Sequence, residues 1–188
     1  GDYLGGTVQM IPHVTNEIKS FLGRAAAQAD VDIAIVEVGG TVGDIESLIF
    51  LEAIRQMRKE VGRDNVCYIH VTLIPNLRTT SELKTKPTQH SVDTLRSRGI
   101  QPDILVCRTE KHLSASIREK LSLFTDVDSK GVIQCHDVQN LYEVPLIMEQ
   151  EGLAARVLER LHMPDATPDL AEWRSMIERI RRPQPTIK

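Results

Sequence analysis

The chain alternates short apolar runs with stretches whose apolar residues recur at helical spacing. Short runs rich in β-branched side chains are typical of buried strands. Spacings of three and four residues are typical of a helix with one buried face. The predicted strands are Val31–Val38, Val66–Ile74, Asp103–Cys107 and Gly131–Cys135. The predicted helices are Ile11–Ala29, Asp44–Val61, Thr88–Arg98, Ser114–Phe124, Ile147–Leu161 and Asp169–Ile180.

Residues at the ends of these stretches support the helices. Pro12 lies in the first turn of the first predicted helix, where a missing N–H breaks no bond. Gly99 follows the third helix, at a position that favours glycine because the backbone turns left-handed there. Ser114 can cap the fourth helix by accepting a backbone N–H. The polar stretch Pro75–Pro87 shows neither pattern, so we expect a loop there.

Helices that separate consecutive strands imply crossover connections, and therefore a parallel sheet with helices on its faces. The predicted fold class is an α/β layered domain over residues 1–180. Arg181–Lys188 carries Pro183 and Pro185 and is predicted to be a linker. In such sheets ligands bind beyond the carboxyl ends of the strands, so candidate chemistry is expected in the segments that follow them.

Composition excludes several classes of protein. The 188 residues carry 23 Lys and Arg against 26 Asp and Glu, a formal charge of −3, whereas proteins that coat nucleic acid usually show a basic excess. No apolar run is long enough to cross a bilayer, and we expect no secretion signal. Cys67, Cys107 and Cys135 lie in or beside apolar runs, which indicates reduced thiols and a cytoplasmic protein. We therefore expect no nucleic-acid or membrane partner.

The segment Glu37–Ser47, after the first predicted strand, combines glycines with acids. The glycines permit left-handed backbone and a close approach by a ligand. Glu37 would end a buried strand, where a carboxylate needs a cation or a donor, and such carboxylates often hold Mg²⁺ near phosphates. Asp44 can cap the next helix. Together with Glu46, these acids favour a site for a metal or for sugar hydroxyls; the alternative is a glycine-rich turn with a capping Asp and a surface Glu.

Lys84 and Lys86 flank Thr85 just before a predicted helix. Pro87 suits the first turn of that helix, and Gln89 adds a neutral donor. The free N–H groups and the dipole of a helix N-terminus favour an anion. This concentration of donors favours a polyphosphate site; the alternative is a solvated Lys-Thr-Lys turn.

Other polar residues give weaker signals. His136–Val138 follows the fourth predicted strand, where the local pattern favours an ordinary turn over a nucleotide contact. Lys120 lies inside a predicted helix and, read alone, is a surface lysine. No Gly-x-x-x-x-Gly-Lys-[Ser/Thr] string occurs, so a nucleoside-triphosphate enzyme with this sequence would need its main phosphate loop elsewhere. The histidines without metal-ligand spacing, expected to be structural, are His13, His70, His112 and His162.

The strings Gly-Gly-Thr-Val-Gly-Asp-Ile-Glu-Ser and Lys-Thr-Lys-Pro-Thr-Gln resemble the synthetase (amidoligase) domain of the CTP synthases. The resemblance covers nearly the whole chain. The sequence departs from the family at Ile49, where proline is common, and at Ser81, where glycine is common. The further segments that carry the resemblance are Gly1–Gln9, Ile11–His13, Pro102–Arg108, His136–Val138 and Leu141–Pro145.

This resemblance implies a function. The family makes CTP from UTP: ATP phosphorylates the uracil 4-oxygen, and ammonia displaces the phosphate. The resemblance also implies Mg²⁺ as cofactor, CTP as feedback inhibitor, a homo-tetramer, and a C-terminal glutamine amidotransferase domain that supplies the ammonia. The implied fold is of the P-loop type, similar to dethiobiotin synthetase. Because the family's phosphate loop, its lysine and a second metal-binding aspartate would precede Gly1, we expect this chain to be an incomplete part of that domain and inactive alone.

By position, the resemblance implies roles for individual residues. Glu37 matches a Mg²⁺ ligand. His136, Asp137 and Val138 match a segment on the adenosine side of ATP, and Leu4 falls in a loop over the ammonia path. The residues that match the UTP or CTP site are Asp44, Ile45, Glu46, Lys84, Thr85, Lys86, Pro87, Thr88, Gln89 and Lys120. For Lys120 this replaces the interpretation as a surface lysine.

Two other interpretations stay open. The chain could be a non-catalytic module that assembles in response to CTP or UTP, because it carries the inhibitor-binding segments without the phosphate loop. It could also belong to another ATP-dependent amidoligase, although the intact Lys84–Gln89 string speaks against that.

Overall fold

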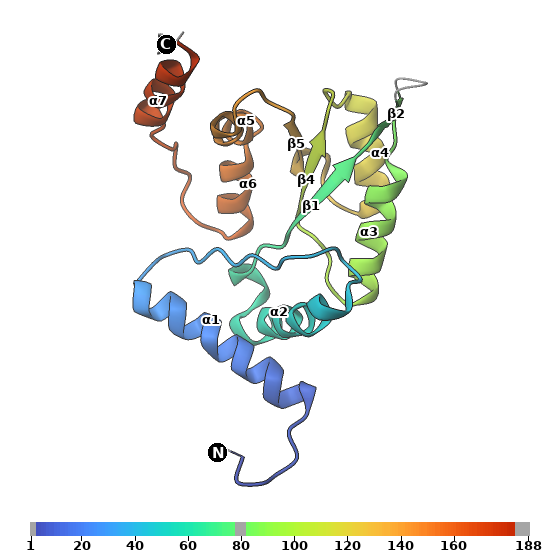
Figure 1. Cartoon of the computed structure of the whole chain (residues 1–188), viewed down its shortest axis with the longest axis vertical. Helices are drawn as coiled ribbons and strands as arrows, with labels where there is room; N and C mark the ends of the chain where they lie inside the picture. The colour runs from blue at the N-terminus through green and yellow to red at the C-terminus, as the bar shows by residue number, and fades with distance from the viewer. Residues whose placement is uncertain (1–2, 78–81, 183–188) are drawn as a thin grey trace, which may run out of the picture. The chain divides into compact units, whose positions relative to one another are not determined.

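The computed structural model describes residues 3–77 and 82–182 (Figure 1). The chain divides into two compact units. The first is drawn from Gly1–Val66 and Asp93–Gln101, and the second from Cys67–Val92 and Pro102–Lys188. The second unit holds a parallel sheet, and the first holds a pair of long helices.

A three-stranded parallel sheet forms the centre of the second unit. Ile74 lies opposite Thr109, and Thr109 lies opposite His136. All three strands therefore reach the same level, and the segments that follow them start at one edge of the sheet. The predicted α/β class with a parallel sheet is confirmed. The strands, in their order across the sheet, are β1 (Ile69–Ile74), β4 (Ile104–Thr109) and β5 (Val132–His136).

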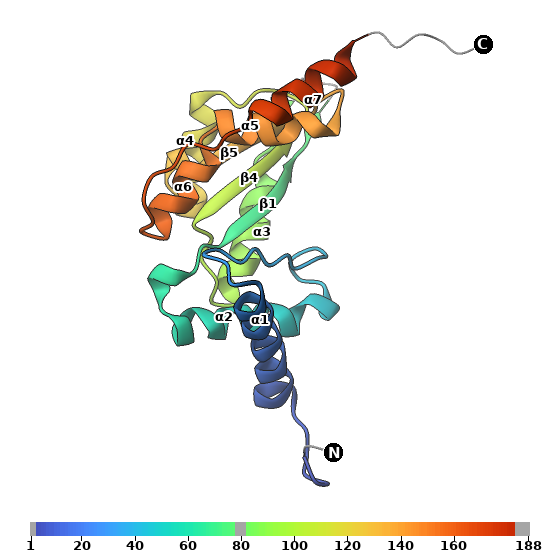
Figure 2. The ribbon, with the colours of Figure 1, turned by 90° about the vertical axis from the view of Figure 1, so that its left-hand side faces the viewer.

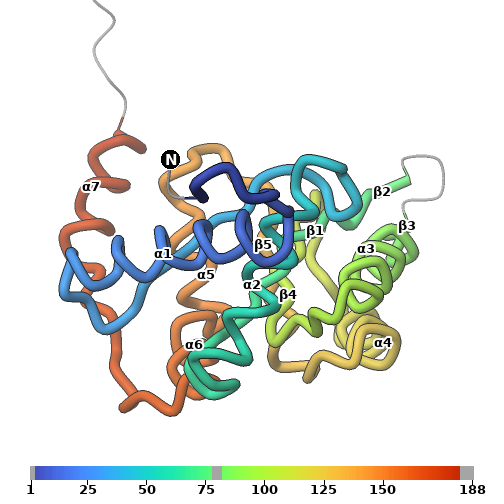
Figure 3. Tube along the Cα trace, turned by 90° about the horizontal axis from the view of Figure 1, so that it is seen from below, coloured from blue at the N-terminus to red at the C-terminus, as the bar shows by residue number. Residues whose placement is uncertain are grey.

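Helices cover both faces of this sheet. Figures 1 and 3 show α4 and the start of α3 on one face and α5 and α6 on the other. Figure 2 shows α7 on the same side as α5 and α6. The helices are α3 (Lys86–Ser97), α4 (Ala115–Thr125), α5 (Val144–Gln150), α6 (Leu153–Arg160) and α7 (Ala171–Arg181), with short turns η4 (Ser129–Gly131) and η5 (Leu141–Glu143).

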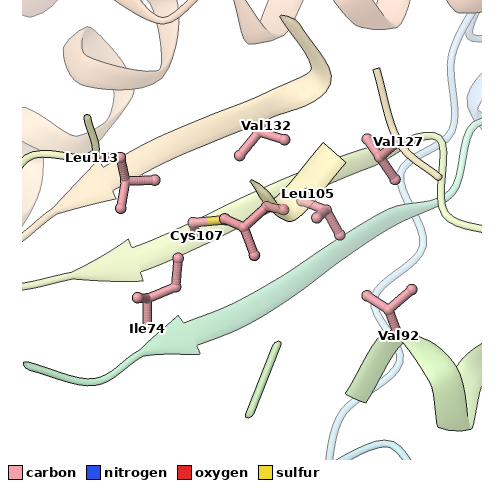
Figure 4. Close-up of a cluster of buried hydrophobic side chains, with 8 residues drawn as sticks. Ile74, Val92, Leu105, Cys107, Leu113, Val127 and Val132 are labelled. Atoms are coloured by element: carbon pink, nitrogen blue, oxygen red, sulfur yellow. The ribbon is translucent and has the colours of Figure 1, made fainter. Parts of the chain in front are cut away.

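The central strand β4 buries side chains on both of its faces. Leu105 and Cys107 pack with Ile74 in one cluster (Figure 4). Ile104 and Val106 belong to a second cluster, packed by side chains of α5 and α6. Successive side chains of a strand point to opposite faces, so a strand covered on both sides needs apolar residues at consecutive positions. This requirement explains the continuous apolar run of β4.

The first unit contains two helices that pack against each other, α1 (Thr15–Ala29) and α2 (Leu48–Val61). The first predicted helix begins at Thr15 rather than at Ile11, because Ile11 has extended backbone angles, φ −119° and ψ 125°. The Thr15 hydroxyl is buried and donates to the carbonyl of Pro12 at 3.1 Å, which anchors the helix start. Shorter turns are η1 (Met10–Val14), η2 (Ile45–Ser47) and η3 (Arg63–Asn65).

The strand predicted over Val31–Val38 is wrong. The structure has no strand there, and the segment has no ladder partner among the described residues. Most of its apolar side chains are exposed, Ile35 to 95%, and Val38 is half-buried. The composition of the run suits a strand, but a strand forms only where a neighbouring strand supplies hydrogen bonds, and the local pattern contains no information about that neighbour.

The polar stretch predicted as a loop contains a short antiparallel pair. Its strands are β2 (Asn76–Leu77) and β3 (Glu82–Leu83). Strands of two residues are too short to show the alternation by which longer strands are predicted. This pair of strands fixes the backbone at Lys84, because the N–H of Lys84 donates to the carbonyl of Pro75 at 2.9 Å.

Two predicted helix ends and one predicted continuous helix can be compared with the structure. Ser114 caps α4, because its hydroxyl accepts from the N–H of Ile117 at 3.3 Å. Gly99 has φ of +80°, the left-handed conformation expected after a helix. Both predictions are confirmed. The single helix predicted over Ile147–Leu161 is instead divided into α5 and α6, because the backbone of Gly152 is left-handed, with φ of +80°.

Among the described residues, no helix combines the length and the apolar content that a membrane crossing requires. Helix α7 continues to Arg181, the first residue of the predicted linker. Residues 183–188 of that linker lie outside the described part of the chain.

Candidate functional site

Two predicted site lysines lie near one carboxylate in the second unit. The ammonium of Lys84 donates to Oε2 of Glu82 at 2.6 Å. The pKa of Glu82 is lowered, first by this hydrogen bond and then by the positive charges of Lys84 and Lys120. Lys120 is on α4, whereas Lys84 follows β3. The fold thus brings two lysines that are distant in sequence into the field of the same carboxylate.

Lys86 extends this group of cations. It is the first residue of α3, so the helix begins two residues before the predicted start at Thr88. The Lys86 ammonium lies 6.0 Å from the ring centroid of Phe124 on α4, within range of a cation–π attraction. The start of α3 therefore faces the helix that carries Lys120. We call the exposed side chains Lys84, Lys86 and Lys120 the lysine surface.

Other residues of the Lys84–Gln89 segment have different surroundings. Thr88 is fully buried, and its hydroxyl lies 3.0 Å from that of Thr72 and donates to the carbonyl of Leu73 at 3.4 Å. Gln89 is buried and donates from Nε2 to the Thr85 hydroxyl at 3.1 Å. These side chains attach the start of α3 to β1 and to itself. Pro87, which lies between Thr85 and Thr88 in the sequence, is exposed.

The third predicted segment begins at the end of β5. The N–H of Asp137 donates to the carbonyl of Thr109 at 3.0 Å, which continues the contact with β4 one residue beyond the strand. His136 is half-buried, and its Nδ1 lies 3.2 Å from Nε2 of Gln134. His136 and Val138 line a cavity of about 510 Å³. Of the three candidates, Asp137 is the exposed one.

The walls of this cavity come from α5, α7 and the segment between β5 and α5. Glu143 and Arg181 form a two-pronged ion pair, with Nε–Oε1 at 3.0 Å and the second contact at 2.8 Å. The hydrogen bond from Arg181 lowers the pKa of Glu143. The Trp173 indole N–H donates to the carbonyl of Tyr142 at 2.8 Å. These two contacts attach α7 to the segment that follows β5.

In the first unit, Asp44 organises the glycine-rich turn rather than capping a helix as predicted. Its Oδ2 accepts from the N–H of Thr41 at 2.8 Å, and no helical N–H bonds to its side chain. Gly40 fits tightly here, because a Cβ on it would lie 3.3 Å from that same oxygen. Its φ of +89° also requires glycine. The prediction of a side-chain cap is wrong, because the nearer donor lies before Asp44, within the turn.

Glu37 is exposed, so the expectation that it ends a buried strand is wrong for the same reason as the strand itself. Its carboxylate lies over Gly39, 3.6 Å from where a Cβ would be. Among residues 3–77 and 82–182, no three acidic, imidazole or thiol side chains group closely enough to hold a metal. A single accessible carboxylate still fits Mg²⁺, which often uses one protein carboxylate together with phosphates and waters.

The remaining predicted residues of the first unit point to solvent. Ile45 is 84% exposed, and Glu46 beside it is also exposed. Leu4 is 96% exposed in a tight turn, in which the N–H of Gly6 donates to the carbonyl of Tyr3 at 2.7 Å. These side chains are accessible to a ligand or partner.

The structure therefore brings the candidates together in two groups. The second unit holds the lysine surface and the segment His136–Val138. The first unit holds Glu37 and the turn with Asp44, Ile45 and Glu46.

Three residues of these groups, Glu82, Phe124 and Gln134, were absent from the sequence-based predictions, and His112 was predicted only as a structural histidine. Glu82 on β3 accepts from Lys84, and Phe124 on α4 lies beside Lys86. Gln134 and His112 contact His136. A signal existed for Gln134, because a glutamine inside an apolar strand needs hydrogen-bond partners.

The three cysteines are free thiols. Cys107 is fully buried in the core, and burial raises its pKa to about 12. Burial also raises the pKa of Cys135. Neither shift favours the thiolate that a nucleophile needs.

Known proteins resemble this chain along nearly its whole length. The family model described as "CTP synthase N-terminus" matches residues 1–163. The chain belongs to this family. It is 60% identical to the CTP synthase of Cyanothece sp. (strain PCC 7425) over all 188 residues, which make up 34% of that protein.

Other relatives agree with this assignment. The CTP synthase of Carboxydothermus hydrogenoformans is 59% identical over 98% of the chain, and that of Methanococcus maripaludis is 58% identical over 100%. The chain spans about a third of the length of the curated relatives it matches. The family expected from the two short strings is confirmed.

Proposed function

We propose that this chain supplies the pyrimidine-nucleotide site and part of the ATP site of a CTP synthase. The observation that supports this most directly is the position of Lys84 and Lys120 around Glu82. Two ammonium groups from separate elements can bind a triphosphate at two points, whereas a lysine on a solvated loop has no such neighbour. The comparisons supply the family, and this geometry supports the anion site.

In this proposal the lysine surface binds the triphosphate of UTP, or of CTP as inhibitor. Lys86 adds a third cation beside the first N–H groups of α3. Thr85, Thr88 and Gln89 hold the helix start in place. Asp44, Ile45 and Glu46 complete the pyrimidine-nucleotide segment, where exposed carboxylates suit sugar hydroxyls.

The segment His136–Val138 binds the adenosine part of ATP in this proposal. Glu37 would hold Mg²⁺ together with nucleotide phosphates, and the ion would neutralise phosphate charge. The γ-phosphoryl group passes from ATP to the uracil 4-oxygen. Ammonia then adds at C4, the carbon that carries this oxygen, and expels phosphate. The contribution of this chain is to bind and orient both nucleotides, which lowers the entropic part of the barrier.

The proposal also includes the features that the resemblance to the family implies. A glutamine amidotransferase part supplies the ammonia, Leu4 lies along its path, and the enzyme works as a homo-tetramer. The free thiols suit a reducing compartment, and we propose a cytoplasmic location.

Substitution of the lysines in the full-length protein tests this proposal. Lys84→Ala and Lys120→Ala should each raise KM for UTP by about tenfold or more, because each removes a charged contact to phosphate. Lys130→Ala is the matched control, since Lys130 is an exposed lysine of the same unit. An unchanged dependence on UTP in both site variants would overturn the proposal. Light scattering with CTP separates it from an assembly module: CTP-driven assembly without turnover would favour the module.

A further inference from the structure

A buried amide lies between two imidazole rings at the end of the sheet. Gln134 is 3% exposed. Its Nε2 lies 2.8 Å from Nδ1 of His112 and 3.2 Å from Nδ1 of His136. The ring centroids of the two histidines are 4.6 Å apart. His112 belongs to the segment after β4, and His136 ends β5, so the amide connects two neighbouring strand ends.

The orientation of this amide is set by the backbone. Oε1 of Gln134 accepts from the N–H of Leu113 at 2.5 Å. Rotation of the amide by half a turn would place its NH₂ group against that N–H, donor against donor. Nε2 of Gln134 therefore faces the rings, and its two hydrogens are available for Nδ1 of His112 and Nδ1 of His136. Each histidine Nδ1 must accept, so the proton of each neutral ring resides on the Nε2 atom of that histidine.

This arrangement disfavours a metal between the histidines. A histidine that binds a metal through Nε2 needs a lone pair there and usually donates from Nδ1. In this pair Nδ1 accepts and Nε2 carries the hydrogen. The pair therefore offers donors to a ligand rather than lone pairs to a metal.

The cavity lined by His136 is partly apolar and suits an uncharged group. Its apolar part comes from Val138, Leu146 and Ile147. Its charged residues are two acids, Glu143 and Glu149, and two arginines, Arg174 and Arg181. Because these charges balance, the cavity has no excess of cations for a triphosphate, whereas a purine base fits both the apolar surface and a neutral donor.

We propose that Gln134 and His112 hold His136 as a neutral Nε2–H donor, which donates a hydrogen bond to a ring nitrogen of the purine base of ATP. Gln134 and His112 are positioning residues in this arrangement, and His136 makes the contact. The inference rests on the proposed role of His136–Val138 in binding the adenosine part of ATP.

The contact is tested with ATP analogues in which N1, N3 or N7 is replaced by carbon. Their affinities for the full-length protein are measured by calorimetry, without turnover. One of the three analogues should bind about three- to tenfold more weakly than ATP, the range for one neutral hydrogen bond. His136→Ala should weaken ATP to a similar extent and abolish the difference between ATP and that analogue. If all three analogues bind the wild-type protein as tightly as ATP does, the base contact is overturned.

The positioning role is tested at Gln134. In Gln134→Glu, one carboxylate oxygen can still accept from Leu113, but the other accepts from the rings and places protons on Nδ1. At a pH high enough to keep the rings neutral, a ring with its one proton on Nδ1 has no N–H at Nε2. Under that condition this variant should lose the discrimination against the deaza analogue, whereas Gln139→Leu, at an exposed glutamine nearby, should keep it. Retained discrimination in Gln134→Glu would refute the role of the amide.

A spectroscopic measurement is independent of nucleotide binding. Solid-state ¹⁵N spectra of histidine-labelled full-length protein, with His112 and His136 identified by their Asn variants, should show both Nδ1 atoms unprotonated at pH 8. A protonated Nδ1 in either ring would overturn the tautomer assignment. Absence of any ATP binding would instead overturn the proposed ATP role of this segment, so the two failures are distinguishable.

Discussion

Lys84 donates to Glu82 at 2.6 Å, and the same carboxylate also interacts electrostatically with Lys120. The nucleotide site proposed above therefore contains its own anion. Glu82 partly neutralises these cations, which would otherwise repel one another. Under the proposed function, a nucleotide phosphate competes with Glu82 for Lys84, so this carboxylate weakens the attraction of the lysine surface for anions.

The first prediction follows from this competition. Glu82→Gln keeps the size of the side chain but removes its charge, so UTP should bind about two- to fivefold more tightly at low salt, the range of an exposed ion pair. The gain should shrink as salt is raised, because exposed charges are screened. Binding is measured by calorimetry on the full-length protein, with Glu17→Gln, remote in sequence and in the first unit, as control. Weaker UTP binding would contradict the competition.

A second prediction concerns Thr88, which is buried against Thr72. Thr88→Val should lower the free energy of unfolding by about 1–3 kcal/mol, because the Thr72 hydroxyl loses its partner. The double variant with Thr72→Val should cost less than the sum of the single changes. Urea denaturation measures both. Thr167→Val, at an exposed threonine, should change stability by at most about 0.5 kcal/mol. Equal effects of Thr88→Val and Thr167→Val would show that the buried bond contributes nothing.

A third prediction concerns the pH dependence of stability through His70. Burial lowers the pKa of His70 below its ordinary value of 6.5, and its Nε2 lies 2.9 Å from the Ser91 hydroxyl. Between the lowered pKa and 6.5 the unfolded chain binds more protons than the folded one, so stability is complete above pH 6.5 and falls as pH decreases.

The fall should have a slope of at most about 1.4 kcal/mol per pH unit for one group. The free energy of unfolding of the wild type and of His70→Gln is measured by denaturation between pH 5 and pH 8. The difference between the two proteins isolates the contribution of His70, because all other groups titrate in both. Parallel curves for the two proteins would rule out the contribution of His70.

A fourth prediction concerns the thiols. Cys107 is fully buried with its pKa raised to about 12, so it should not react with an aromatic disulfide reagent at pH 8 until the protein unfolds. Cys135 is half-buried and should react first of the two. Mass spectrometry of labelled peptides, with and without urea, gives the order. If Cys107 of the folded protein were labelled as fast as Cys135, the burial of Cys107 in the core would be contradicted.

The parallel sheet could be predicted because β4 and β5 are covered on both faces, which requires the continuous apolar runs that the sequence displays. The same reasoning failed for Val31–Val38, whose composition suits a strand but which has no partner among the described residues. Strand pairing is a contact between distant segments, and a local pattern cannot contain it. The division at Gly152 was missed because apolar spacing continues across it, while only the backbone angle reveals the break.

For the candidate site, residue types and short strings indicated candidate segments, and the family that the strings suggested is the one whose model matches. What they could not give is the state of each side chain. The resemblance matched Thr88 to the nucleotide site, yet its hydroxyl bonds to Thr72 and Leu73. Glu82 drew no attention, because an acid beside a lysine is common on protein surfaces. Such differences depend on burial and on partners far along the chain.

Ile74, Thr109 and His136 lie side by side across the sheet, in one row at the ends of the three strands. This arrangement affects how members of the family can diverge. The paired residues end here, and one residue beyond them the N–H of Asp137 adds a further bond to the carbonyl of Thr109. Insertions or substitutions beyond the row can therefore accumulate without shifting strand register. Under the proposed function, these loops recognise the nucleotides, so loop exchange between family members is a route to altered nucleotide preference on an unchanged scaffold.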